Sequence, residues 1–69
     1  MERFPVQSGA LASLGYDQSR RILEVEFASG RIYQYFDVPP REVQGLVGAT
    51  SRGAYFARCV RDRYAFEAV

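Results

Sequence analysis

The segment FASGRIYQYF, residues 27–36, places two tyrosines, Tyr33 and Tyr35, one residue apart after a serine–glycine turn. A two-residue turn at Ser29 and Gly30 would direct both rings to the outer face of a sheet. Turns of that length favour positive φ at both central residues, or glycine at the first, and this pair offers neither. We therefore predict a three-residue loop with Gly30 in the left-handed position of a glycine bulge.

The bulged loop also fixes the register of the two strands that it joins. It pairs Val25 with Tyr33 and Leu23 with Tyr35, so the tyrosines share the apolar face of the preceding strand. The hydrophobic pattern alone leaves the register open, because the tight turn misplaces only Gln34 among its inward residues. On the turn chemistry, we expect both rings to pack beneath helices, with their hydroxyls bonded or reaching water near an edge.

The alternative is an outward aromatic platform of the kind that single-strand binders use to stack bases. In that register, Glu24 and Glu26 would flank the two rings. Carboxylates repel the phosphates that dominate affinity for nucleic acid, which makes the platform the weaker interpretation.

Three segments have the alternating pattern of strands: about 11–16, 21–27 and 31–38, the last closed by Val-Pro-Pro. Helical spacing then predicts one helix from Pro40 to near Gly48. A second helix follows, capped by Thr50 or Ser51 and continuing through about Tyr64. The order is βββαα, an α+β fold in which a three-stranded antiparallel meander is covered on one face by two helices. With 69 residues, we expect 1–69 to form a single domain.

The composition is that of a packed globule, with 48% hydrophobic residues and five tyrosines and five phenylalanines. Cys59 is the one cysteine, so no internal disulfide is available and we expect a reducing cytoplasm. No apolar run approaches the length of a membrane helix or a signal sequence, so we expect a soluble protein that does not contact membranes.

Charge is nearly balanced overall, with nine arginines against eight acids and a net charge of +1. Strong nonspecific attraction to nucleic acid through net charge is therefore excluded. The distribution is uneven, because residues 52–63 contain four arginines and only one acid, Asp62. The carboxyl-terminal part of the chain is locally basic.

Several segments together resemble the small KTSC domain: LEVEF, the glycine turn, YQY, VPP, SRGAYF and VRDRY. The resemblance spans about Ser8 to Tyr64. The family name refers to the carboxyl terminus of some lysyl-tRNA synthetases, and the domain also occurs alone in short bacterial proteins. The resemblance implies a module of uncharacterised role, and the association with synthetases suggests that this module binds RNA. One departure is Gly9 after Ser8, where related sequences tend to have a pair of serines.

The residues that would carry RNA binding lie in the predicted second helix: Arg52, Tyr55, Arg58 and Arg63. A helical wheel places Arg52, Tyr55 and Arg63 on one flank of the apolar stripe. Arg52 stands in the first turn, where it opposes the helix dipole unless an anion binds there. A solvated arginine without function is the alternative interpretation.

An enzyme is not expected, because the chain has no histidine to activate a serine or cysteine, and Cys59 falls within a helix beside the apolar stripe. Metal and cofactor sites are not expected either, since one cysteine and scattered carboxylates do not form a coordination sphere. The second hypothesis is a protein-interaction module. In it, a partly apolar outer sheet face would dock a protein partner or a second copy through Ile22, Ile32 and Phe36, among Glu24, Glu26 and Gln34.

Overall fold

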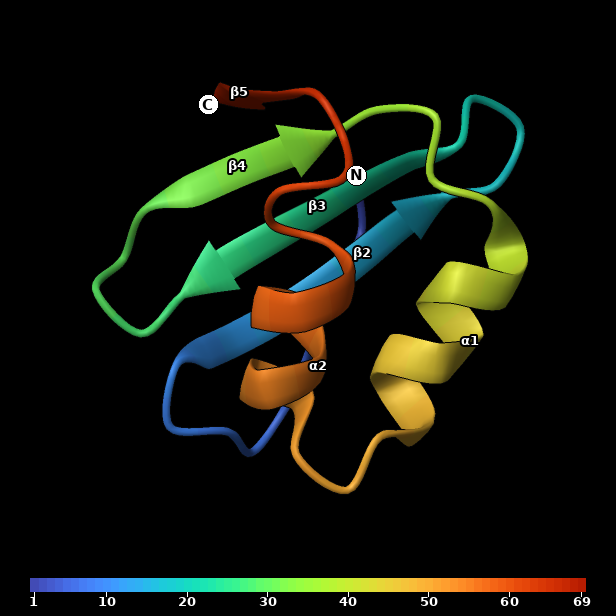
Figure 1. The fold of residues 1–69 in the computed structure, drawn as a ribbon. Helices are drawn as coiled ribbons and strands as arrows, with labels where there is room; N and C mark the ends of the chain where they lie inside the picture. Colours follow the sequence, from blue (N-terminus) through green and yellow to red (C-terminus); the bar gives the residue numbers. More distant parts are fainter.

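A computed structural model describes residues 1–69 and shows an antiparallel sheet with two helices on one face (Figure 1). The elements in chain order are β1 (Phe4–Pro5), β2 (Leu11–Asp17), β3 (Ile22–Phe27), β4 (Ile32–Tyr35), α1 (Pro40–Gly48), α2 (Arg52–Cys59) and β5 (Phe66–Ala68). The strands lie side by side in the order β1-β2-β3-β4-β5.

The α+β class and the helices on one face agree with the prediction, but the sheet has five strands rather than three. The two additional strands, β1 and β5, are the edge strands and contain two and three residues. Segments this short show no detectable alternation of apolar and polar residues. Their pairing depends on tertiary contacts and cannot be predicted from a hydrophobic period. The βββαα order is therefore wrong at both ends of the chain.

The β3–β4 loop has the predicted bulged geometry. Gly30 has a φ of 95° and its N–H bonds the Phe27 carbonyl at 2.9 Å, while the Phe27 N–H bonds the Arg31 carbonyl at 2.9 Å. Tyr33 lies opposite Val25, and Tyr35 opposite Leu23. Both rings are consequently on the helix side of the sheet, as the turn chemistry predicts.

The core forms between this face of the sheet and the two helices. A bulge in β2 between Leu11 and Ser13 lets Leu11 and Leu14 share the inner face, and it turns Ser13 outward to pair with Glu26. Tyr35 is only 2% exposed. The nine buried core residues are Leu11, Leu14, Leu23, Val25, Tyr35, Val38, Leu46, Phe56 and Val60.

Helix α1 agrees with the prediction, whereas α2 is shorter than predicted. The Ser51 hydroxyl caps α2 by accepting from the Ala54 N–H at 3.3 Å. The helix ends at Cys59, because the N–H groups of Val60 and Arg61 both bond the Phe56 carbonyl, at 3.0 and 2.9 Å. Cys59 is thus the last helical residue rather than an internal one.

The apolar stripe continues past the end of α2, which explains the error in its length. Val60 remains fully buried although it lies outside the helix, and the chain then turns through residues 61–64 before it enters β5. A hydrophobic period read from sequence cannot distinguish one more turn of helix from a buried turn of this kind.

The outer face of the sheet is not the open, acidic surface that the alternation indicates. Glu24 is buried at 5% exposure, and its carboxylate accepts hydrogen bonds from Arg3 and, at 2.9 Å, from the Gln34 amide. The amino-terminal residues reach this face across Gly15, where a β-carbon would come within 2.5 Å of the Glu2 carbonyl oxygen. The amino-terminal segment therefore covers part of the outer face that the protein-interaction hypothesis would use for docking.

Neither helix is long and apolar enough to cross a membrane.

Candidate functional site

The flank of α2 that contains Tyr55 faces α1 and meets the carboxylate of Glu42. The hydroxyl of Tyr55 donates to one Glu42 oxygen, and the hydroxyl of Tyr64 donates to the other at 2.8 Å. An Arg63 guanidinium nitrogen lies 3.9 Å from the same carboxylate. These side chains and Arg41 line a polar hollow of about 310 Å³. We call this group the Glu42 cluster.

The cluster perturbs the ionisation of its members. Burial pushes the pKa of Glu42 upward, but the hydrogen bonds from Tyr55 and Tyr64 and the charges of Arg63 and Arg41 together lower it below its usual value. The hydrogen bond to Glu42 raises the pKa of Tyr55 to about 12. Burial, and then the same carboxylate, raise the pKa of Tyr64. The carboxylate is therefore held charged and both phenols are held neutral.

Gly45 allows Tyr55 to reach this carboxylate. A β-carbon at Gly45 would lie 2.2 Å from the Tyr55 hydroxyl oxygen, closer than atoms can approach. Because Gly45 has no side chain, the Tyr55 phenol fits between the two helices.

The structure brings only some of the predicted RNA-binding residues together. Tyr55 and Arg63 meet at Glu42. The Arg52 side chain donates to the Val47 carbonyl at 3.1 Å, so it binds the carboxyl-terminal end of α1. That contact explains a cation in the first turn of α2 without a bound anion. Arg58 is exposed.

Glu42 was absent from the sequence-based site. Its position in the first turn of α1 is a common one for an acid, because a carboxylate there complements the helix dipole. The two tyrosines that bond it are 13 and 22 residues away, and no local pattern connects them.

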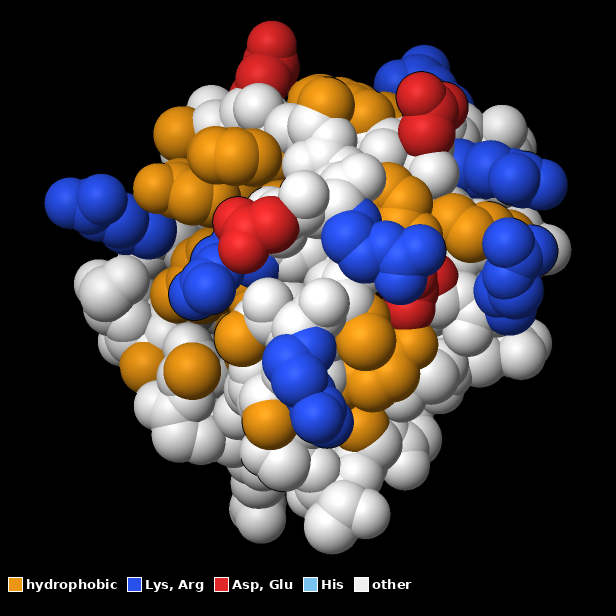
Figure 2. All heavy atoms as spheres, viewed as in Figure 1, with side chains coloured by type: hydrophobic (Ala, Val, Ile, Leu, Met, Phe, Trp, Pro, Cys, Tyr) orange, Lys and Arg blue, Asp and Glu red, His pale blue; other side chains and the backbone are white.

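A second candidate site is an apolar groove of about 420 Å³ beside α2, which we call the aromatic groove. It lies between the sheet and α2 on the face shown in Figure 2, where hydrophobic side chains gather over the β4 and β5 side of the molecule. Arg61 and Asp62, both exposed, also line it. Its aromatic residues are Phe27, Tyr33, Tyr35, Phe56 and Phe66.

The rings in the groove contact one another closely. Tyr33 and Phe66 stack, with ring centres 5.3 Å apart and planes inclined by 13°. Tyr35 meets Phe56 edge to face at 5.4 Å. Phe66 is 51% exposed and Tyr33 is half-buried, so the stacked pair is open to solvent while Tyr35 lies deeper. This groove could not be predicted from the sequence, because one of its walls is the unpredicted strand β5.

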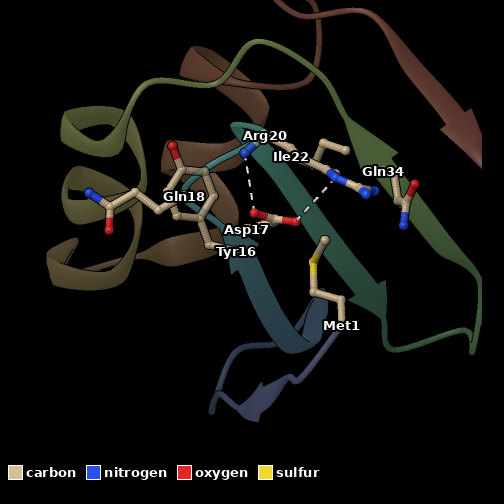
Figure 3. A pocket seen from close by; sticks show the side chains of 7 residues that line it. All are labelled: Met1, Tyr16, Asp17, Gln18, Arg20, Ile22 and Gln34. Atoms are coloured by element: carbon tan, nitrogen blue, oxygen red, sulfur yellow. Dashed lines mark hydrogen bonds and ion pairs between the residues drawn. The ribbon is translucent and has the colours of Figure 1, made fainter.

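A third hollow, of about 470 Å³, lies at the turn between β2 and β3 (Figure 3). The Asp17 carboxylate accepts hydrogen bonds from the Ser19 hydroxyl at 2.8 Å and the Arg20 N–H at 3.2 Å. The hydroxyl of Tyr16 donates to the Val38 carbonyl at 2.6 Å. The polar groups here are occupied in holding the turn and the loop before α1.

Comparison with known proteins supports one family. A family model described as the KTSC domain matches residues 7–64. An uncharacterized protein of Stutzerimonas stutzeri is 47% identical over 64 residues, which are 93% of this chain and 90% of that protein. A lysine–tRNA ligase of Nostoc punctiforme is 33% identical over 61 residues, which are 88% of this chain and 11% of the ligase.

The fold is also similar to that of a solved structure. The crystal structure of a KTSC domain protein from Yersinia pestis matches with a TM-score of 0.96 and 34% identity, over 99% of this chain and 96% of that one. The resemblance noted in the sequence is thereby confirmed. The chain belongs to the KTSC domain family.

Proposed function

We propose that this protein is a non-enzymatic module that binds single-stranded RNA. The observation that carries the proposal is a set of exposed arginines on the two helices and the turn after α2, of which one, Arg61, lines the aromatic groove. We call the set the arginine band; it consists of Arg41, Arg58, Arg61 and Arg63.

The band has the properties of a surface that contacts phosphates. The side chains of Arg61 and Arg63 are 60% and 63% exposed, and their ion pairs are long, at 3.7 Å to Asp62 and 3.9 Å to Glu42. The pair of Arg61 with Asp62 is exposed on both sides and contributes little to stability, so the Arg61 guanidinium is free to exchange partners. Figure 2 shows basic side chains spaced across this face of the molecule, with hydrophobic side chains between them. Guanidinium groups suit bidentate contacts to phosphate.

The relatives add a second line of support. A segment similar to 75–88% of the chain occurs within lysine–tRNA ligases of three strains, at 33–36% identity. Those proteins act on tRNA by name, and a small module attached to them gains from affinity for a phosphate backbone.

The proposal modifies the set of residues expected from the sequence. Arg58 and Arg63 remain in the site, and Arg41 and Arg61 join it. Arg52 and Tyr55 are assigned to holding α2 against α1, because their polar groups bond Val47 and Glu42.

The outer sheet face is the weaker candidate for a partner. Its centre is occupied by the network of Arg3, Glu24 and Gln34, and the Ser13 hydroxyl donates to Glu26 at 2.8 Å. We also place the module in the cytoplasm, since Cys59 is a free thiol in a chain with no other cysteine.

A binding titration with a fluorescent single-stranded RNA at several salt concentrations tests the function. Phosphate contacts give log K a slope of about −0.7 per contact against log salt for single strands. Arg58→Ala/Arg63→Ala should weaken binding and make this slope shallower by about 1.4, for two lost contacts.

The matched control is Arg20→Ala/Arg21→Gly, which removes two exposed charges from the β2–β3 turn. Glycine is used at position 21 because Arg21 has a φ of 57°. The control should retain wild-type affinity and slope. Equal losses in both variants, or no binding of wild type at low salt, would refute an RNA function for the arginine band.

A further inference from the structure

We propose that the aromatic groove holds one unpaired base of the bound RNA strand, with the Tyr35 hydroxyl bonding its polar edge. This inference rests on the proposed function and adds base stacking to its phosphate contacts; the aromatic groove and the arginine band share Arg61. It is carried by three features of the groove: its open rings, a tyrosine hydroxyl that makes no hydrogen bond within the protein, and arginines nearby.

The first feature is a pair of partly exposed aromatic rings. Phe66 and Tyr33 stack at 5.3 Å, and half of the Phe66 surface is exposed. Phenyl and phenol rings offer stacking faces to any base. The volume of about 420 Å³ falls within the range of roughly 300–1,000 Å³ that is usual for small-molecule sites.

The second feature is the hydroxyl of Tyr35. The residue is 2% exposed, and its hydroxyl makes none of the hydrogen bonds within the protein. No side-chain oxygen that is sealed from solvent lacks a partner, so the Tyr35 hydroxyl is accessible to solvent, and the residue lines the groove.

The hydroxyls of Tyr16, Tyr55 and Tyr64 each donate to a protein oxygen. Those of Tyr33 and Tyr35, which both line the groove, make no such bond and are free to bond water or a ligand. Burial raises the pKa of Tyr35 to about 12, so the group is a neutral donor and acceptor at physiological pH.

The third feature is charge on either side of Tyr33. Arg61 lines the aromatic groove together with Asp62, which lies 3.7 Å from it, and Arg31 lines an adjoining hollow of about 300 Å³ that also contains Tyr33. Both arginines are exposed. A strand that places one base on the rings can therefore meet a guanidinium with the phosphate before the base and another with the phosphate after it.

An apolar peptide side chain is the other occupant that an aromatic groove can take. The unpartnered hydroxyl and the two arginines favour a base, because an aliphatic side chain satisfies neither. The test therefore includes both ligands.

The experiment compares the affinities of an eight-nucleotide single-stranded RNA and an abasic strand of the same length and phosphate number. Wild type should bind the RNA about 10-fold or more tightly than the abasic strand, since stacking of a single base is a substantial part of single-strand affinity. Tyr33→Leu and Phe66→Leu should reduce this ratio to near 1 and leave binding of the abasic strand unchanged.

Two further variants separate the roles of ring and hydroxyl. Tyr35→Phe removes only the hydroxyl and should lower RNA affinity several-fold without lowering the thermal midpoint. Phe4→Leu is the matched control, because Phe4 is 44% exposed on the opposite edge strand, and it should change nothing. Amide NMR spectra of each variant verify the fold, and the Tyr33 and Phe66 amides should shift with RNA.

The outcomes separate the two proposals. Equal binding of RNA and abasic strands by wild type would overturn the base site and leave the phosphate-binding function standing. No binding of either strand would overturn both. Shifts of the groove amides by a leucine- and phenylalanine-rich peptide, with none by RNA, would assign the groove to a protein partner and overturn the base site.

Discussion

Glu42 shows how one residue can connect parts of the chain that lie far apart in sequence. Its carboxylate accepts from the phenols of Tyr55 and Tyr64, which lie 13 and 22 residues further along the chain. It thereby links the first turn of α1 to α2 and to the segment that leads into β5. Hydrogen bonds to a charged acceptor contribute about 1.5–3 kcal/mol to stability, more than neutral ones.

Glu42→Gln should therefore destabilise the protein by about 1–3 kcal/mol, because an amide is a weaker acceptor and cannot serve two phenols equally well. Urea denaturation at neutral pH measures the change. Glu67→Gln, an exposed glutamate on β5, is the control and should alter the free energy of unfolding by less than about 0.5 kcal/mol. If the two substitutions lower the free energy of unfolding by the same amount, the phenol contacts to Glu42 do not stabilise the fold.

At the scale of elements, the least expected feature is how the amino-terminal segment is held. β1 contributes only two residues to the sheet, yet Arg3 beside it bonds the buried Glu24 and, at 3.0 Å, the Ser13 hydroxyl. The close approach over Gly15 brings this arginine to the middle of the outer face. A short strand is thereby tied to β2 and β3 by its side chain as well as by its backbone.

Arg3→Ala should cost about 3 kcal/mol, because it leaves the Glu24 carboxylate buried without its cation. The double variant Arg3→Ala/Glu24→Gln should recover much of that loss, since the unpaired charge is then gone. Arg20→Ala breaks an exposed ion pair of 3.9 Å and should cost no more than about 1 kcal/mol. Thermal and urea unfolding measure all three, and a double variant no more stable than Arg3→Ala would show that the lost charge pairing is not the cause.

The elements differ in how well the sequence predicted them. The β3–β4 register follows from the chemistry of one loop around Gly30, and α1 follows from Pro40 and helical spacing; both depend on neighbours in sequence. The end of α2 was misjudged because Val60 is buried both in a helix and in the turn that replaces it. β1 and β5 were missed because two or three residues pair only when the rest of the fold presents a partner strand.

In the candidate sites too, features that depend on neighbours in sequence could be predicted, and features that depend on distant residues could not. The basic character of residues 52–63 was evident, but the roles of its members depend on residues elsewhere in the chain. Arg52 is engaged by Val47 and Tyr55 by Glu42, and neither partner could be identified from spacing within α2. The aromatic groove required knowing that β5 brings Phe66 beside Tyr33.

For the molecule as a whole, the buried ionisable groups predict a defined range of pH stability. The pKa of Glu24 is lowered, because hydrogen bonds from Gln34 and Arg3 outweigh the effect of burial, and that of Glu42 is lowered for the reasons given above. A lowered carboxyl pKa contributes stability that is complete above the unfolded value of 4.5 and is lost as the pH falls through the folded value.

At alkaline pH the tyrosines limit the stability, because their pKa values are raised rather than lowered. The pKa values of Tyr35 and Tyr55 are raised to about 12, so their contribution is complete below the unfolded value of 10.0 and is lost as the pH rises toward 12. Urea midpoints measured from acid to alkaline pH should show a plateau between these limits. Glu24→Gln/Glu42→Gln should lower the plateau and flatten the acid side; an unchanged acid side would mean that other carboxyls control acid unfolding.

The two brief outermost strands have a consequence for assembly. β5 pairs three of the four residues of β4, whereas β1 pairs only two of the seven residues of β2. Loss of β1 would leave this edge of β2 as one uninterrupted row of unpaired backbone groups, a template on which further copies could add strand by strand. Removal of the Arg3 contacts is therefore expected to favour aggregation as well as to lower stability.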